Sequence, residues 1–349
     1  MGLSKLICLK KVLQLGINFG RASVSSRNYS DDHHGANACG GHEGATGGSQ
    51  VTSDGSKKGL VLGVYEEKGK LELSPAAQEL DQKSEGKISR HLNELSCEMH
   101  LGKAFAVTDV VPEYSVVALA SMGPKDAGYN KLEELDEARE NVRWGVGAGV
   151  SLLRARGCGH IDVDGASIPD AAAEAAHLAA WSFSEFKSVQ QPAADLALYG
   201  KDDAEQWAEG TILGGAQNWA RYLSDMPANR MTPVDLAQAA LDTLCPLGIS
   251  VTVRDLAWLR AQNMEGVLTV SRGSCETPVL LECHYHAADT QPVLLAAKGV
   301  TFDSGGLCLK PAPLMEENRG SMAGAAVTLA ALKALAELKV YISQLNIFM

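Results

Sequence analysis

Short apolar stretches alternate with helical patterns along most of this chain, and that alternation most limits how it can fold. Residues 59–65, 104–111 and 114–123 read GLVLGVY, AFAVTDVV and YSVVALASMG, and polar turns bound each of them. Runs of this kind are typical of buried strands. Residues 136–157 instead repeat apolar side chains three and four positions apart, which is the helical period. Strands that alternate with helices predict an α/β fold built in layers.

Capping residues indicate where two helices begin. Asp170 opens an alanine-rich helical pattern at 170–183, and its side chain is expected to cap that helix. Thr232 and Pro233 stand together in PANRMTP. The threonine side chain can accept a hydrogen bond from a free backbone amide in the first turn of a helix. Proline suits the first position of a helix, because the N–H that it lacks would have no partner there. A helix is therefore predicted to start at Pro233.

The chain is long enough for two domains, and we expect a small N-terminal α/β domain at 59–190. At 191–349 we expect a second α/β domain with a mixed sheet flanked by helices. Its predicted helices are 204–226, 233–246, 256–264 and 321–338, and its predicted strands are 249–255, 266–273, 278–285 and 292–302.

The N-terminal 58 residues differ in composition from the rest of the chain. Residues 1–30 carry basic and serine side chains among apolar ones and no acidic residue, which predicts a mitochondrial transit peptide; a cytoplasmic protein with an unaddressed extension is the alternative. Residues 31–58 are rich in Gly, Ser and Asp and predict a disordered linker. His33, His34 and His42 lie in that tract, where weak metal binding is possible and simple solvation is the favoured interpretation.

Composition also argues against several classes of partner. The formal net charge of -11 and the lack of Lys and Arg clusters disfavour nucleic-acid binding. No apolar run approaches the roughly 20 residues that span a bilayer, so no membrane contact is expected. The eight cysteines form no CxxC pair and are expected to be reduced thiols that fill core space. Gly145, Gly147 and Gly149 lie within a helical pattern, where they predict close packing and not a phosphate-binding loop.

The segment KGVTFDSGG, residues 298–306, combines chemistry-bearing residues with a flexible turn. Lys298 is expected inside an apolar run and Asp303 at its end, and ligands of α/β sheets bind at the carboxyl ends of strands. Gly305 and Gly306 allow a close approach of backbone or substrate, and Lys310 follows four residues later. From the residues alone, a buried lysine beside a carboxylate is either a plain ion pair or part of a site.

KGVTFDSGG, the LCLK that follows it and the upstream PANRMTP resemble the leucyl aminopeptidase family, the cytosol-type dinuclear aminopeptidases, over roughly residues 58–340. The resemblance implies a peptidase that removes N-terminal amino acids from peptides with two divalent ions, zinc or manganese, which share and activate a water. It assigns Lys298 and Asp303 as metal ligands, and Lys310 as the catalytic residue that polarises the scissile carbonyl. Family members form hexamers, so copies of this chain or related paralogues are the expected partners.

The same resemblance identifies a changed ligand. The family carries a metal-binding aspartate in a segment resembling Met-Asp-Leu-Met-Arg-Ala-Asp-Met-Gly-Gly, where this chain reads MEENRGSMAG. Arg319 is kept, whereas Ser321 stands where the aspartate is expected. The Ser321 hydroxyl is expected to cap the following helix but to replace a carboxylate ligand poorly. Glu316 or Glu317 is an alternative replacement ligand.

The remaining ligands of the family and its catalytic arginine lie in a segment Asn-Thr-Asp-Ala-Glu-Gly-Arg that has no counterpart in the given sequence. The resemblance therefore implies that 191–349 is an incomplete α/β domain of the catalytic type. After Val340 the chain reads YISQLNIFM, and no Asp, Glu or Arg follows Glu337. Of five expected protein ligands, two are therefore present, one is changed and two are missing. We expect no tight dinuclear site and impaired or absent catalysis.

Three other hypotheses remain open. In the first, the chain is an active aminopeptidase whose given sequence is incomplete. In the second, it is a non-enzymatic structural protein of mitochondria, as the inactive relatives among insect sperm proteins suggest. In the third, its first domain is a partner-binding module.

Overall fold

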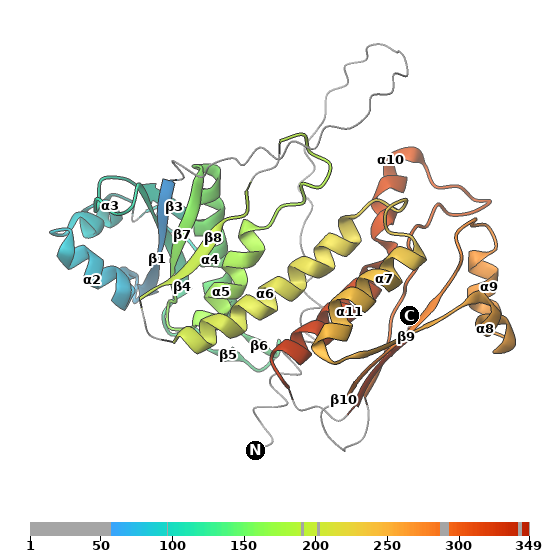
Figure 1. The fold of residues 1–349 in the computed structure, drawn as a ribbon. Helices are drawn as coiled ribbons and strands as arrows, with labels where there is room; N and C mark the ends of the chain where they lie inside the picture. Colours follow the sequence, from blue (N-terminus) through green and yellow to red (C-terminus); the bar gives the residue numbers. More distant parts are fainter. Residues whose placement is uncertain are drawn as a thin grey trace, which may run out of the picture.

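The computed structural model describes residues 57–95, 97–189, 192–200, 203–286, 293–340 and 344–348. The predicted targeting segment at 1–30 and nearly all of the predicted linker at 31–58 lie outside these residues. Two mixed β-sheets lie at opposite ends of the described part, and the long helix α6, Ala204–Asp225, runs between them (Figure 1). Helices flank both sheets, so the predicted α/β class is confirmed.

The first sheet is organised around β1, Lys57–Glu67, because its alternating side chains supply two separate cores. Leu60 and Leu62 face one core, and Val61 faces the other. The strand order is β3-β4-β1-β7-β8, with β2 paired antiparallel to β1. The other strands are β2 Lys70–Leu73, β3 Ala104–Val107, β4 Val116–Pro124, β7 Cys158–Asp164 and β8 Asp195–Tyr199.

Helices cover both faces of this sheet. On the Leu60 face lie α2, Pro75–Lys83, and α3, Lys87–Leu95; on the Val61 face lie α4, Glu137–Ala155, and α5, Pro169–Ala180. A small hairpin precedes α4; its strands are β5 Tyr129–Asn130 and β6 Leu135–Asp136.

The glycines of α4 confirm the prediction of close packing at two of three positions. A Cβ added at Gly145 would collide with Met122 and the backbone of Ser121, and one at Gly149 would collide with Val61. At Gly147 a Cβ would meet nothing within 4 Å, so packing does not require glycine there.

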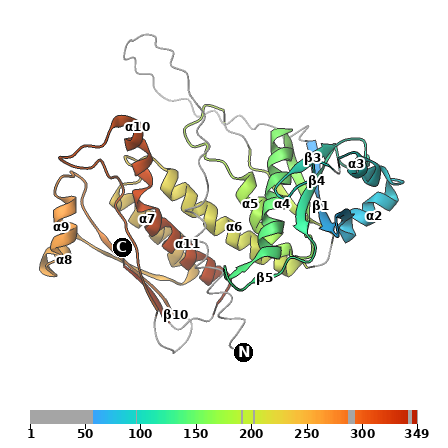
Figure 2. The ribbon, with the colours of Figure 1, turned by 180° about the vertical axis from the view of Figure 1, so that it is seen from behind.

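Helix α6 packs against both halves of the molecule. Gly210 and Gly214 lie where a side chain would collide with α5, whereas Leu213, Ala220 and Leu223 join the core of the second half, together with α11. Figure 2 shows the same order from behind, with α6 between α5 and α11. The helix therefore fixes each half of the molecule to the other.

The second sheet has the order β11-β12-β10-β9, in which only β11 and β12 are parallel. Helices α7 and α11 pack on it through a shared core. Thr232 caps α7 and exchanges hydrogen bonds with Asp235, so the predicted start of this helix is confirmed. The strands are β9 Ser250–Arg254, β10 Leu280–His286, β11 Val293–Ala296 and β12 Gln344–Phe348. The helices are α7 Pro233–Leu244, η2 Cys245–Leu247, α8 Leu256–Ala261, α9 Glu265–Ser271, α10 Ala312–Met315, η3 Glu316–Met322 and α11 Ala323–Glu337.

Three local predictions are wrong. The predicted strand 266–273 is the helix α9, which buries none of its residues and lies beyond β9, so its backbone bonds form within the segment. The predicted strand 292–302 ends already at Ala296. Asp170 does not cap α5, because it lies inside the helix and pairs with Arg139 instead.

The cysteine prediction holds only in part. All six cysteines within the described ranges are free. Cys158 and Cys283 are buried, and burial raises the pKa of the Cys283 thiol to about 12. The other four, Cys97, Cys245, Cys275 and Cys308, are exposed and do not fill core space. No helix in the described part of the chain is long and apolar enough to cross a bilayer.

Candidate functional site

The candidate site is a loop that follows β11 and contacts the first turn of α11. Lys298 lies two residues after the strand ends and is exposed, so the prediction that it sits inside a buried apolar run is wrong. Its carbonyl oxygen accepts a hydrogen bond from the amide of Ala325 at 3.1 Å. The first turn of α11 therefore fixes the backbone of the loop and leaves the lysine side chain at the surface.

Asp303 and Lys310 close the turn that follows. One oxygen of Asp303 accepts a hydrogen bond from the Gly305 amide at 3.0 Å, and the other pairs with Lys310 Nζ at 3.1 Å. The Lys310 ammonium, and after it the Gly305 amide, lower the pKa of the Asp303 carboxyl below its ordinary value. Lys298 is not the ion-pair partner of Asp303, although its charge acts in the same direction.

Gly305 has a conformation that this turn requires. Its φ of 93° lies in the region that side chains rarely adopt, and a Cβ there would collide with the carbonyl of Cys308. The amide of Lys310 donates to the carbonyl of Ser304 at 2.9 Å and completes the turn. The predicted role of Gly305 in close backbone approach is therefore met within the loop itself.

Each of the two lysines is bound by a neutral side chain of η3. Lys310 Nζ donates to Asn318 Oδ1 at 2.7 Å, and Lys298 Nζ donates to Ser321 Oγ at 2.8 Å. Asn318 was not predicted, since no local pattern ties it to a lysine eight residues earlier. Ser321 was predicted to cap α11, and this is wrong: Met322 is the N-cap and no side chain caps the helix. The Ser321 hydroxyl instead faces Lys298.

The turn η3 is also tied to α6. Arg319 Nη2 pairs with Asp225 Oδ1 at 3.1 Å, and its Nε donates to the Asp225 carbonyl at 3.2 Å. The Glu316 carbonyl accepts from Nη1 of the same arginine at 3.2 Å. Glu316 and Glu317, the alternative ligands, have exposed side chains.

This donor set does not fit two divalent ions. In the described part of the chain, no group of three or more His, Cys, Asp and Glu residues could hold a metal. The one carboxylate of the loop, Asp303, has both oxygens engaged by Gly305 and Lys310. Protein sites hold zinc through three or four side-chain donors and manganese through several carboxylate or carbonyl oxygens, and this loop does not supply two such sets.

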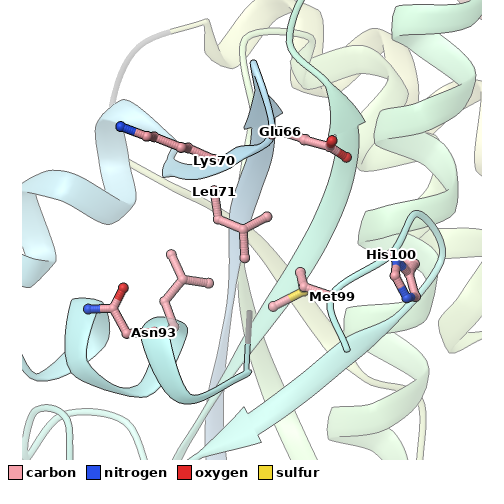
Figure 3. A pocket seen from close by; sticks show the side chains of 8 residues that line it. Glu66, Lys70, Leu71, Asn93, Met99 and His100 are labelled. Carbon is pink, nitrogen blue, oxygen red and sulfur yellow. The ribbon is translucent and has the colours of Figure 1, made fainter. Parts of the chain in front are cut away.

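A pocket of about 530 Å³ lies elsewhere, in the first half of the molecule between the β1–β2 turn and α3. Leu71 and Met99 point toward its middle, whereas the polar ends of Lys70 and Asn93 turn away at its rim (Figure 3). A small-molecule site needs polar groups that converge on the ligand. Lys70 and Asn93 do not converge in this way, and the loop is the stronger candidate because it carries the motif residues Lys298, Asp303 and Lys310.

Comparison with known proteins covers both halves of the chain. Residues 61–190 match the model of the cytosol aminopeptidase family, N-terminal domain, and residues 218–348 match that of the cytosol aminopeptidase family, catalytic domain. The cytosol aminopeptidase of Xenopus tropicalis is 34% identical over 307 residues, which are 86% of this chain and 59% of that protein. The human cytosol aminopeptidase is 32% identical over 305 residues, which are 85% of this chain and 59% of that protein.

Two solved structures are similar in fold. The bottromycin maturation enzyme BotP in complex with Mn has a TM-score of 0.65 at 26% identity, over 84% of this chain and 59% of that one. A mutant of tomato leucine aminopeptidase has a TM-score of 0.65 at 19% identity, over 86% of this chain and 60% of that one, and shows the fold alone. The chain thus spans about three fifths of the length of the relatives it matches.

Proposed function

Because the chain belongs to the cytosol aminopeptidase family, we propose that it is an aminopeptidase-type protein of impaired hydrolytic activity. In that family, as the sequence resemblance implies, two divalent ions activate the water that attacks the N-terminal peptide bond. Peptide N-termini are the substrate class that follows. The residues present here do not match the charge of two such ions, so no catalytic step through them is assigned to this chain.

The observation that carries the proposal is the contact between Lys298 and Ser321. The lysine predicted to bind a metal through its amine instead donates to a neutral hydroxyl at 2.8 Å. That hydroxyl stands where the resemblance places a carboxylate. A serine at this position adds no negative charge to the loop, and Asp303 is held by Lys310.

Lys310 has the same difficulty as a catalytic residue. The resemblance assigns its ammonium to the scissile carbonyl, but Asp303 and Asn318 both bind Nζ here. To polarise a substrate, Lys310 would have to exchange one of these two contacts for the carbonyl oxygen.

The test is metal content and hydrolysis of leucyl p-nitroanilide, measured side by side with Mn²⁺ or Zn²⁺ for the unmodified protein and for Ser321→Asp. We expect no turnover above buffer and no stoichiometric metal after dialysis for the unmodified protein, and a gain in bound metal for Ser321→Asp. Ser151→Asp, at an exposed position on α4 in the first half of the molecule, is the matched control. Stoichiometric metal and turnover in the unmodified protein would refute impaired hydrolysis.

A second candidate is the non-enzymatic assembly role, with copies of this chain or related paralogues as partners. It is supported by Leu307, Leu309 and Leu314, which are 109%, 65% and 61% exposed on and beside the candidate loop. Exposed apolar side chains gathered in one place favour contact with a protein. Light scattering of the purified protein tests this, and a monomer at all concentrations would contradict it.

The mitochondrial address also stays a proposal. It rests on the basic, acid-free composition of residues 1–30. A fluorescent protein fused behind these residues is expected to enter mitochondria and to lose the segment, whereas a diffuse cytoplasmic signal would favour the alternative.

A further inference from the structure

The contact between Arg319 and Asp225 joins parts of the chain that are 94 residues apart. Arg319 makes three hydrogen bonds, two to Asp225 at the end of α6 and one to the Glu316 carbonyl within η3. Each of its three nitrogens therefore has a partner. The guanidinium is used to hold backbone and carboxylate groups and is not aimed at a ligand.

The turn that Arg319 holds supplies both neutral partners of the two lysines. Asn318, which binds Lys310, precedes the arginine directly, and Ser321, which binds Lys298, follows two residues later. Any displacement of η3 along α6 moves both acceptors together. The separation between the turn and α6 thus controls the surroundings of both lysines.

Helix α6 is a rigid support for this contact. Gln217 Nε2 donates to the buried Glu174 of α5 at 2.6 Å, and Gly210 and Gly214 bring the two helices close. The second half of α6 lies in the core that it shares with α11 (Figures 1 and 2). Asp225 is therefore carried by a helix that both halves of the molecule hold in place.

We propose that Arg319 and Asp225 act together as a positioning clamp, which fixes η3 so that Asn318 and Ser321 reach Lys310 and Lys298. Arg319 is thus a positioning residue of the candidate site. The proposal rests on the proposed function only in treating the two lysines as that site. The side chains of Arg319 and Asp225 are 39% and 36% exposed, and ion pairs so exposed contribute little to global stability. The contact should therefore act on local geometry.

The experiment compares Arg319→Met with a matched control, Arg254→Met. Arg254 is 38% exposed and pairs with Glu282 at 2.9 Å between two strands of the second sheet. Backbone hydrogen exchange over 316–322 and the rate of amine labelling at Lys310, both read by mass spectrometry, report on the clamp. Arg319→Met is expected to raise the exchange over 316–322 several-fold. It is also expected to raise the labelling rate of Lys310 several-fold relative to that of Lys125, an exposed lysine of the first half that pairs with Glu67 and Glu72. Arg254→Met is expected to change neither.

Two outcomes would overturn the clamp. One is a folded Arg319→Met protein with unchanged exchange and labelling, and the other is an equal rise in Arg254→Met. If Arg319→Met does not fold, Asp225→Asn replaces it, with Glu282→Gln as its control. Asp225→Asn removes the charge of the pair but keeps the carbonyl bond to Arg319. A rise in exchange and labelling larger than that of Glu282→Gln supports the clamp, and an equal or smaller rise refutes it. No readout depends on hydrolysis, so failure of the proposed function does not affect the result.

Discussion

The molecule contains two clusters of charged side chains that obey different rules. The first lies between α4, α5 and α6, where Glu174 is only 3% exposed. Glu174 pairs with Arg139 at 2.9 Å and Arg143 at 3.4 Å and accepts a hydrogen bond from Gln217 at 2.6 Å. Asp170 also pairs with Arg139. At the candidate site, the one carboxylate, Asp303, pairs with Lys310. The other partner of Lys310 is the neutral Asn318, and Lys298 donates to the neutral Ser321.

The difference follows from solvent access. Buried charges must balance, because an unpaired one loses its hydration without compensation. In the network each arginine therefore has two carboxylate partners. Arg139 pairs with Asp170 and Glu174, and Arg143 pairs with Glu140 at 2.9 Å and with Glu174 at 3.4 Å. At the surface, water completes the solvation of Lys298, so a carboxylate can be exchanged for the Ser321 hydroxyl at small cost to the fold. Chemistry can change at the candidate site while the fold remains.

Glu174→Ala tests whether the buried network contributes more to stability than the surface cluster, and it has the largest expected effect. It leaves Arg139 and Arg143, whose side chains are 13% and 17% exposed, without their shared carboxylate. Breaking a buried pair on one side costs about 3–5 kcal/mol. Arg139 keeps Asp170 and Arg143 keeps Glu140, so the lower end of that range is expected. Urea unfolding should show a loss of that order, and a loss below about 1 kcal/mol, the range of surface pairs, would show that water reaches the network.

Gly210→Ala tests the contact of α6 with α5 by shape alone. The added Cβ would collide with the carbonyl of Asp170, and overpacking of this kind typically costs about 1–3 kcal/mol. Gly147→Ala is the control, because its Cβ would meet nothing within 4 Å. Alanine at 147 should leave stability unchanged or raise it by up to about 1 kcal/mol. Equal unfolding midpoints for both variants would mean that the helices do not touch as closely as described.

His177 gives the buried interface a pH dependence. Burial lowers the pKa of its imidazole below 6.5, so the unfolded chain binds a proton more readily than the folded one. The stability that the neutral imidazole contributes is fully present above the pKa that His177 has in the unfolded chain. It declines as the pH falls from that pKa toward the lower pKa of the folded protein. His177→Gln should flatten the stability profile between about pH 7 and 5, where an unperturbed histidine titrates. Substituting the exposed His100 in the same way is the control, and identical profiles for wild type and His177→Gln would contradict the prediction.

The smallest expected effect belongs to Lys310→Met. It removes the contacts of the ammonium with Asp303 and Asn318, but these lie at the surface and exposed pairs contribute little. The unfolding midpoint should shift less than in Glu174→Ala or Gly210→Ala. The pKa of Asp303, followed by carboxyl NMR, should rise toward its ordinary value, because Lys310 is the main cause of its lowering. If Lys310→Met destabilises the protein as much as Glu174→Ala does, the buried and exposed clusters do not differ in their contribution to stability.

Local signals predicted much of the fold. Apolar runs identified β1 and β4, and Thr232 marked the start of α7, because burial of a strand and capping of a helix depend on near neighbours in the sequence. The segment 266–273 was misread, since its apolar residues suit a strand as well as a short exposed helix, and only the absence of a neighbouring strand decides.

The candidate site was predictable as a set of residues but not as a set of contacts. Lys298, Asp303 and Lys310 lie in one loop, whereas the apolar run 292–302 predicted Lys298 inside a strand and Asp303 at its end. The partners Ser321 and Asp225 are 23 and 94 residues away from Lys298 and Arg319, respectively, and no periodicity connects such pairs. Asp170 was misassigned for the same reason, because its partner Arg139 belongs to a different helix.

Gly305 has a consequence for how such proteins are recognised. No side chain can be placed at that position without opening the turn, because its Cβ would collide with the carbonyl of Cys308. A loop of this shape therefore shows that the glycine is in place, and it does not by itself show that the charged residues around it catalyse a reaction.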